Sequence, residues 1–167
     1  NVTGNSNTAI GHKALLNNST ADYNTALGRY AIGENTTGTR NVGIAPFALD
    51  ANTTGSYNVA IGYASLTGNT TANYNTAVGY YALEANTTGD HNVAIGYAAL
   101  DANVEGDRNV AVGNHAMSTH NPSSNEDGYS TAVGYAALGL DTTGKYNTGI
   151  GAWALYNNTT GEKNTAL

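Results

Sequence analysis

The chain has 167 residues, a formal net charge of −6, only 11% charged residues and no cysteine. An acidic chain with dispersed basic residues argues against nucleic acid as a partner, because such binding requires clustered Lys and Arg. Disulfides and thiolate chemistry are excluded within this sequence. No apolar run is long enough to cross a bilayer, so we expect no membrane insertion by this segment.

A repeat with a spacing of 17 residues dominates the sequence. Each copy opens with the motif Asn-Thr/Val-Ala/Gly-Ile/Leu/Val-Gly, and the seventh copy, residues 109–129, is longer than the others. The copies begin at Asn7, Asn24, Asn41, Asn58, Asn75, Asn92, Asn109, Ser130, Asn147 and Asn164, so that complete copies fill residues 7–163. A fixed period of this kind is typical of solenoids, and we therefore expect one repeat array over residues 1–167. Because the sequence begins and ends within a repeat, we expect it to be a fragment of a longer chain.

Positions are numbered below from the residue that opens each copy. Positions 1–5, as in residues 75–79, alternate like a strand, and positions 7–9, as in residues 81–83, predict a second short strand. Gly at position 5 and Asn-Thr-Thr-Gly at positions 12–15 have turn chemistry. A helical repeat is disfavoured by the frequent Gly, the β-branched residues and the short period. The predicted fold class is all-β: a parallel β-solenoid with about one 17-residue coil per repeat.

Position 4 is always a branched aliphatic residue and position 9 is nearly always Leu, so we expect these side chains to form the core. Ala and Gly at positions 3 and 8 suggest a face of small residues that packs against other chains. Burial of each aliphatic side chain contributes about 1.5–3 kcal/mol, whereas ordering one backbone residue costs about 1–2 kcal/mol. One chain therefore looks insufficient, and an oligomer is predicted.

Asparagine at position 1 predicts a ladder along the stack, since identical residues fall in columns when coils stack in register. The residues expected to form this ladder are Asn7, Asn24, Asn41, Asn58, Asn75, Asn92, Asn109 and Asn147.

The motif Asn-Thr/Val-Ala-Ile/Val-Gly resembles the head repeat of trimeric autotransporter adhesins. The longer phrase Asn-Thr-Ala-Val-Gly-Tyr-x-Ala-Leu-x-x-Asn-Thr-Thr-Gly, as in residues 75–89, is similar to 17-residue arrays in phage tail fibres and related bacterial surface proteins. The resemblance covers essentially the whole chain. It implies a left-handed β-roll, a side-by-side homotrimer, an extracellular location on a virion tail fibre or bacterial cell surface, and a host cell-surface receptor or glycan as partner. Adhesin heads have shorter repeats, which leaves open whether this coil is two-sided or three-sided.

Catalytic chemistry is not indicated, and we expect neither an enzyme nor a cofactor. The four histidines occupy variable repeat positions, without the base and orienting acid that a nucleophile needs. His115 and His120 lie near Glu126 and Asp127 in the chain, but their spacing matches no metal-site signature. Solvated loop residues are the favoured interpretation, and no metal ion is predicted.

The long seventh copy is the one clear departure from the repeat. Residues 120–127 replace its usual Asn-Thr-Thr-Gly turn, and an insertion in a solenoid must leave the stack as a loop, where binding residues often lie. The predicted receptor or glycan contacts are His120, Asn121, Ser123, Asn125, Glu126, Asp127 and Tyr129. A tolerated neutral insertion is the alternative.

Three recurring side chains have both structural and functional interpretations. Tyrosines at positions 6 and 17 either cover the turns or stack on sugar rings. Asn-x-Thr sequons at position 12 are either turn residues or glycosylation sites, and the Thr pairs at positions 13 and 14 either form turns or bind ice. The leading hypothesis is a structural and adhesive rod segment of an extracellular trimeric fibre. The alternatives are a subunit of an extracellular filament, or a monomeric solenoid that binds carbohydrate or ice.

Overall fold

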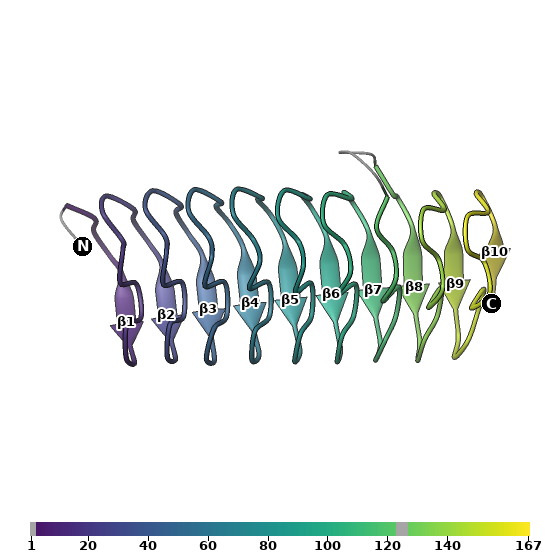
Figure 1. Cartoon of the computed structure of the whole chain (residues 1–167), viewed down its shortest axis with the longest axis horizontal. Coiled ribbons are helices and arrows are strands. Elements are labelled where there is room, and N and C mark those ends of the chain that lie inside the picture. The colour runs from purple at the N-terminus through teal and green to yellow at the C-terminus, as the bar shows by residue number, and fades with distance from the viewer. Residues whose placement is uncertain (1–2, 123–126) are drawn as a thin grey trace.

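The computed structural model describes residues 3–122 and 127–167 as a row of stacked coils, with one strand in each coil (Figure 1). The strands form a single ten-stranded parallel sheet in chain order. They are β1 (Thr8–Ile10), β2 (Thr25–Leu27), β3 (Val42–Ile44), β4 (Val59–Ile61), β5 (Thr76–Val78), β6 (Val93–Ile95), β7 (Val110–Val112), β8 (Thr131–Val133), β9 (Thr148–Ile150) and β10 (Thr165–Ala166). The prediction of an all-β parallel solenoid is confirmed. Among the described residues there is no helix, and hence none that could cross a membrane.

Neighbouring coils pair strictly in register. Thr76, Ala77 and Val78 of β5 lie beside Val93, Ala94 and Ile95 of β6. The hydrogen bonds between coils continue beyond the sheet: Leu83 N donates to Ala99 O at 3.0 Å, and Ala85 N donates to Asp101 O at 3.0 Å. Each coil is therefore hydrogen-bonded to the next around much of its perimeter. These bonds satisfy backbone groups that lie outside the short strands.

The predicted second strand at positions 7–9 is wrong. In the fifth coil Tyr81 and Leu83 have left-handed backbones, with φ of 58° and 55°. Two consecutive turns result, closed by Ala82 N to Gly79 O at 3.4 Å and Asn86 N to Leu83 O at 3.3 Å. A left-handed conformation costs an L-residue about 1–2 kcal/mol. Here the bonds between coils and the complete burial of Leu83 stabilise it, and neither is visible in a local sequence pattern.

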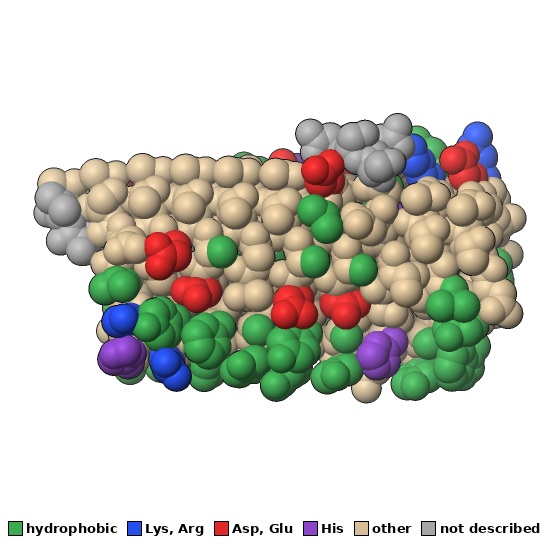
Figure 2. Space-filling model, viewed as in Figure 1, with side chains coloured by type: hydrophobic (Ala, Val, Ile, Leu, Met, Phe, Trp, Pro, Cys, Tyr) green, Lys and Arg blue, Asp and Glu red, His purple; other side chains and the backbone are tan. Residues whose placement is uncertain are grey.

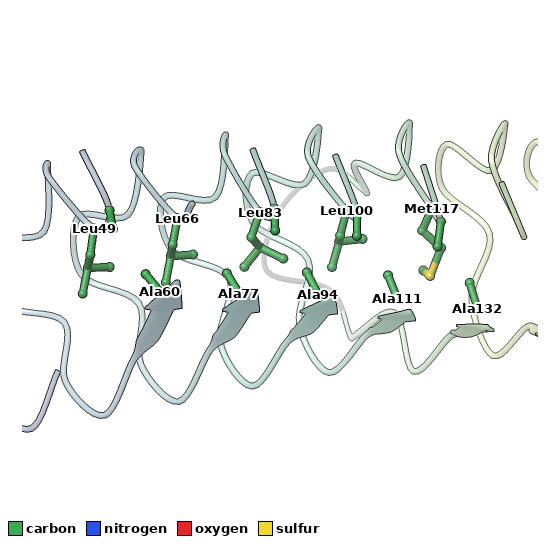
Figure 3. Close-up of a cluster of buried hydrophobic side chains, with 14 of the residues drawn as sticks. Leu49, Ala60, Leu66, Ala77, Leu83, Ala94, Leu100, Ala111, Met117 and Ala132 are labelled. Carbon is green, nitrogen blue, oxygen red and sulfur yellow. The ribbon is translucent and has the colours of Figure 1, made fainter. Parts of the chain in front are cut away.

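The predicted core is wrong for position 4 and right for position 9. Leucines at position 9 and alanines at positions 3 and 8 fill the interior, and Figure 3 shows the leucine column lying against the strand alanines. The aliphatic residues at position 4 point outward instead; Ile61 is 36% exposed and Ile95 is 39% exposed. The small-residue face expected to meet other chains therefore lies inside the coil.

The narrowness of the coil explains this arrangement. A Cβ built on Gly43, at position 3, would lie 2.6 Å from Cγ1 of Ile32, the position 9 residue of the previous coil. The side chain from the opposite wall thus fills the space above the strand and leaves room for a methyl group at most. Position 5 is tighter still, because a Cβ on Gly28 would lie 2.5 Å from the carbonyl carbon of Ala45 in the next coil. Backbone contact between coils therefore favours Gly at position 5, and Ala45, with a φ of 112°, is the one exception among the complete copies.

Candidate functional site

The asparagines at position 1 form a buried ladder on the inner side of the strands. The backbone N–H of Asn92 donates to Oδ1 of Asn75 at 2.8 Å, and Nδ2 of Asn75 donates to the carbonyl of Gly89 at 2.8 Å. The same pair of bonds recurs in successive coils, for example between Asn58 and Asn41. These side chains fasten each strand to the next coil and are not available to a ligand.

A second buried ladder runs through position 12, which the sequence marks only as a turn and a sequon. Nδ2 of Asn86 donates both to Oδ1 of Asn69 at 3.2 Å and to the carbonyl of Gly89 at 3.0 Å. The position 12 asparagines Asn18, Asn35, Asn52, Asn69, Asn86 and Asn103 are all buried. All of these except Asn103 open an Asn-x-Thr sequon. Since a glycosylated amide must be accessible, the structural interpretation of these five sequons is favoured.

The second ladder changes chemistry where the repeat is interrupted. His120 takes position 12 in the seventh coil and Asp141 takes it in the eighth, and both side chains are fully buried. Neither ring nitrogen of His120 has a hydrogen-bond partner among the described residues, and Oδ1 of Asn103 has none either. The amide that would donate to Asn103 in a regular coil is missing, because a histidine replaces it.

Burial moves the pKa values of these two residues in opposite directions. Desolvation disfavours the imidazolium and lowers the pKa of His120 to about 4. Desolvation also disfavours the carboxylate and raises the pKa of Asp141 to about 6, although the backbone N–H of Gly144 and the amide of Asn147 partly oppose that rise. The expectation that His120 is a solvated loop residue is wrong, and its buried ring cannot contact a receptor in this structure.

The other predicted contacts fall in two places. Oδ1 of Asn121 accepts the backbone N–H of Val104 at 3.2 Å, so this side chain helps to close the turn. Asp127 forms an ion pair with Arg108, and Tyr129, 46% exposed, lies next to both. The predicted contacts Ser123, Asn125 and Glu126 lie outside the described residues.

Asp127 and Tyr129 belong to an exposed column at the edge that precedes the strands. The Tyr129 ring stacks on Tyr146 at 5.5 Å between centroids, and the Arg108 guanidinium lies 5.7 Å from the Tyr129 ring. Further along the same column Tyr57 stacks on Tyr74 at 5.0 Å. Such stacks cover the turns, and their outer faces stay open to solvent, so both interpretations of the tyrosine columns stand.

A second aromatic column, at positions 6 and 7, follows the opposite edge, where the strands end. Tyr63 stacks on Tyr80 at 4.8 Å and meets Phe47 edge-on at 5.8 Å. Figure 2 shows hydrophobic side chains gathered along this long edge, whereas the neighbouring wall is largely polar. The sequence pointed to the tyrosines at position 6, but it did not indicate that residues at positions 6 and 7 form one continuous strip.

The outer face of the sheet combines aliphatic side chains with threonines and is uncharged. Positions 2 and 4 of every strand are Thr, Val, Ile or Leu, and those at position 4 are partly or largely exposed. This face runs the length of the stack, since the strands lie side by side in one row (Figure 1). Contiguous apolar patches of more than a few hundred Å² are uncommon on monomeric proteins and mark interaction surfaces.

Residues 3–122 and 127–167 hold no group of three or more His, Cys, Asp or Glu side chains that could bind a metal ion. His115 and His120 do not converge, because the His120 ring is buried in the asparagine ladder whereas His115 lies in the second aromatic column, 5.2 Å from the Tyr97 ring. No family model matches the chain, and neither a curated protein nor a solved structure shows significant similarity to it.

Proposed function

We propose that this chain is a rod segment of an extracellular fibre in which three copies associate side by side through the outer faces of their sheets. The observation that carries the proposal is the uncharged face that the strands form from aliphatic residues at position 4 and Val or Thr at position 2. The left-handed roll and the trimer are what the resemblance to adhesin heads and tail-fibre arrays adds. The role is geometric: stacked coils hold receptor contacts away from the base of the fibre.

A second copy of the chain is the occupant that best fits this face. Side chains project from it at the spacing of successive strands, about 4.8 Å, over the whole row of coils. Another rod of the same repeat presents ridges and grooves at the same spacing, so the two faces interdigitate coil by coil. A partner without this period would match at a few coils only.

The small interior supports association as well. A coil buries one side chain of the size of leucine and two of the size of alanine. In the fifth coil these are Leu83, Ala77 and Ala82. Tyr81 and Leu83 of the same coil hold left-handed backbones that cost conformational energy. Burying the outer aliphatic residues between rods adds apolar contact where a single coil has little.

The mass in solution tests the proposal. A trimer of this 17.1 kDa chain is expected in sedimentation equilibrium. Ile61→Glu with Ile95→Glu places charges on the outer sheet face and should reduce the mass to that of one chain. Thr71→Glu, on an exposed turn of the same coil as Ile61, is the matched control and should leave the assembly intact.

A stable monomer at every concentration would refute the trimeric rod. The chain would then be a candidate for the alternative hypothesis, a monomeric solenoid that binds carbohydrate or ice. For ice, the Thr pairs lie on turns: Oγ1 of Thr53 donates to Thr70 O at 2.9 Å, while the neighbouring Thr54 is exposed. An ice recrystallisation assay on the same preparation separates these alternatives.

A further inference from the structure

A pocket of about 210 Å³ opens in the second aromatic column, between the seventh and ninth coils. His115, Ser118 and Thr119 of the seventh coil form one wall, and Trp153 and Tyr156 of the ninth coil form the other. The eighth coil contributes Tyr135, Ala136, Gly139 and Leu140. The sequence gives no sign of this site, because its residues fall at ordinary repeat positions in three different copies.

The pocket exists because one ring is missing from the column. Position 7 is Ala in three coils, at Ala64, Ala98 and Ala136. Beside Ala64, the ring of Tyr63 contacts both Phe47 and Tyr81, which closes the gap.

Beside Ala98, the ring of Tyr97 lies 5.2 Å from His115 and closes that gap too. Beside Ala136, however, the Tyr135 ring turns to Trp153, at 5.1 Å, and within the described chain no ring contact joins it to His115.

Gly139 lets a ring of the next coil form one wall of the site. Position 10 of the eighth coil is Gly139, and a Cβ there would lie 2.8 Å from Cε2 of Tyr156. The Tyr156 ring of the ninth coil thus lies over Gly139 of the eighth coil, which has no side chain. Ser118 takes the same repeat position in the seventh coil. The unfilled volume therefore lies beside Ala136, where the column lacks a ring, and the Tyr156 ring borders it.

We propose that this pocket binds a single neutral pyranose ring of a glycan. Three aromatic rings meet there almost at right angles: Trp153 lies at 65° to Tyr135 and at 78° to Tyr156. Such walls form a cup around a puckered ring, whereas a flat aromatic ligand needs two parallel faces. The C–H face of a pyranose carries the slight positive charge that the negative face of an indole attracts.

The polar groups at the rim match the hydroxyl groups of a sugar. Oγ1 of Thr119 donates to the carbonyls of Gly139 at 3.0 Å and Asp141 at 3.1 Å, which leaves its lone pairs to accept. The Ser118 hydroxyl bonds to no other described residue. Among the described residues no acidic or permanently charged side chain lines the pocket, so it suits an uncharged ligand.

The size fits one ring rather than an oligosaccharide, since drug-sized ligands occupy pockets of about 300–1,000 Å³. An open site of this size is expected to hold a monosaccharide with a dissociation constant of about 1–10 mM. Many copies on a fibre would raise the apparent affinity. The site is built from one chain at positions 6 to 11, away from positions 2 and 4 of the sheet, so this inference does not depend on association of the rods.

Trp153 is the only tryptophan and is 52% exposed, so its fluorescence reports on the pocket directly. We would titrate the chain with the methyl pyranosides of glucose, galactose and mannose, with N-acetylglucosamine, and with p-cresol as a flat aromatic probe. Saturation-transfer NMR on the same samples gives a readout that does not rely on tryptophan. At least one pyranose should give a saturable change in the emission of Trp153.

Ala136→Tyr supplies the missing ring and should weaken binding of that sugar at least tenfold. Ala98→Tyr makes the same change at the same repeat position outside the pocket and should leave binding within twofold of wild type. Tyrosine is compatible with both sites, because Tyr30 and Tyr81 occupy position 7 with φ of 57° and 58°, close to the 51° of Ala136. Circular dichroism verifies that both variants fold.

Three results would overturn the proposal. One is the lack of a saturable response to every pyranose; another is unchanged sugar binding by folded Ala136→Tyr. The third is binding of p-cresol that competes with and exceeds that of every sugar, which would show a flat aromatic site. Sedimentation on the same samples shows whether the rods associate, so failure of the pocket and failure of the trimeric rod are distinguished.

Discussion

Replacing Gly43 with alanine tests how the interior of the coil is filled. The added methyl group would lie 2.6 Å from Cγ1 and 3.1 Å from Cδ1 of Ile32. Overpacking of this kind costs about 1–3 kcal/mol, while Gly→Ala by itself gains about 0.4–1 kcal/mol through the unfolded chain. We therefore expect Gly43→Ala to destabilise the wild-type protein by about 1–2 kcal/mol.

The sign should reverse when Ile32 is also replaced by leucine. Leucine at position 9 against alanine at position 3 of the next coil is the pairing found elsewhere in the stack, as for Leu66 and Ala77. In an Ile32→Leu background, Gly43→Ala should stabilise by about 0.5–1 kcal/mol, which makes a coupling energy of about 1.5–3 kcal/mol. Guanidinium unfolding of the four proteins at one concentration measures it.

Gly149 is the matched control for this cycle. A Cβ built on Gly149 would lie 3.1 Å from the carbonyl oxygen of Ala154, much as one on Gly43 would lie 3.1 Å from that of Ala48, but its distance to Cγ of Leu138 is an ordinary 3.4 Å. Without the clash with position 9, Gly149→Ala should be neutral or stabilising in the wild-type protein. If the effects of Ile32→Leu and Gly43→Ala add to within about 0.5 kcal/mol, the side chain at position 9 does not determine the residue at position 3. The claim that position 9 fills the space above position 3 of the next coil would then be refuted.

Other substitutions probe the strained and interrupted coils. Ala45 holds a φ of 112°, where every other complete copy has Gly, so Ala45→Gly should stabilise by about 1–3 kcal/mol in thermal unfolding. His120→Asn restores a donor to Oδ1 of Asn103 and should stabilise by about 1–3 kcal/mol at pH 7. The lowered pKa of His120 means that the unfolded chain binds more protons than the folded chain between pH 6.5 and about 4, so stability is lost as pH falls through this window. The raised pKa of Asp141 means that the folded chain binds more protons between about 6 and 3.8, so stability is gained there as pH falls. As pH falls towards 4, the free energy of unfolding of His120→Asn should therefore rise by up to about 3 kcal/mol relative to wild type, and that of Asp141→Asn should fall by as much. Parallel pH profiles of stability for all three proteins would contradict both assignments.

The period predicted the solenoid and its register, because a repeat of 17 residues closes one coil and places equivalent residues of successive copies beside one another. It could not predict which side of the strand is inside. Alternation says only that Ala77 and Val78 face opposite ways, and hydrophobicity favours burying the valine. The decision belongs to Leu83 and its equivalents, which fill the interior from the opposite wall. That is a long-range packing constraint, and no local pattern contains it.

The sequence does not predict the left-handed turns for a related reason. Tyr81 and Leu83 carry no preference for positive φ, and only the close stacking of coils holds them there. The buried asparagines at position 12 were likewise read as turn residues, since their bonds to the previous coil appear only after the coils stack. The place of His120 in the ladder could have been predicted by counting residues from Asn109, because His120 occupies position 12 of its copy.

Several departures from the repeat lie close together in the stack of coils. The insertion, the substitution of His120 and Asp141 into the asparagine ladder, and the vacancy at Ala136 all lie in the seventh and eighth coils. A regular coil cannot offer a binding pocket, because its columns are filled by the coils on either side. A site therefore requires a local break, and the break weakens the ladder that stabilises the stack. Positions where sequence rules fail are expected to be functional or strained, and these coils hold both the unpaired polar groups of the ladder and the proposed pocket.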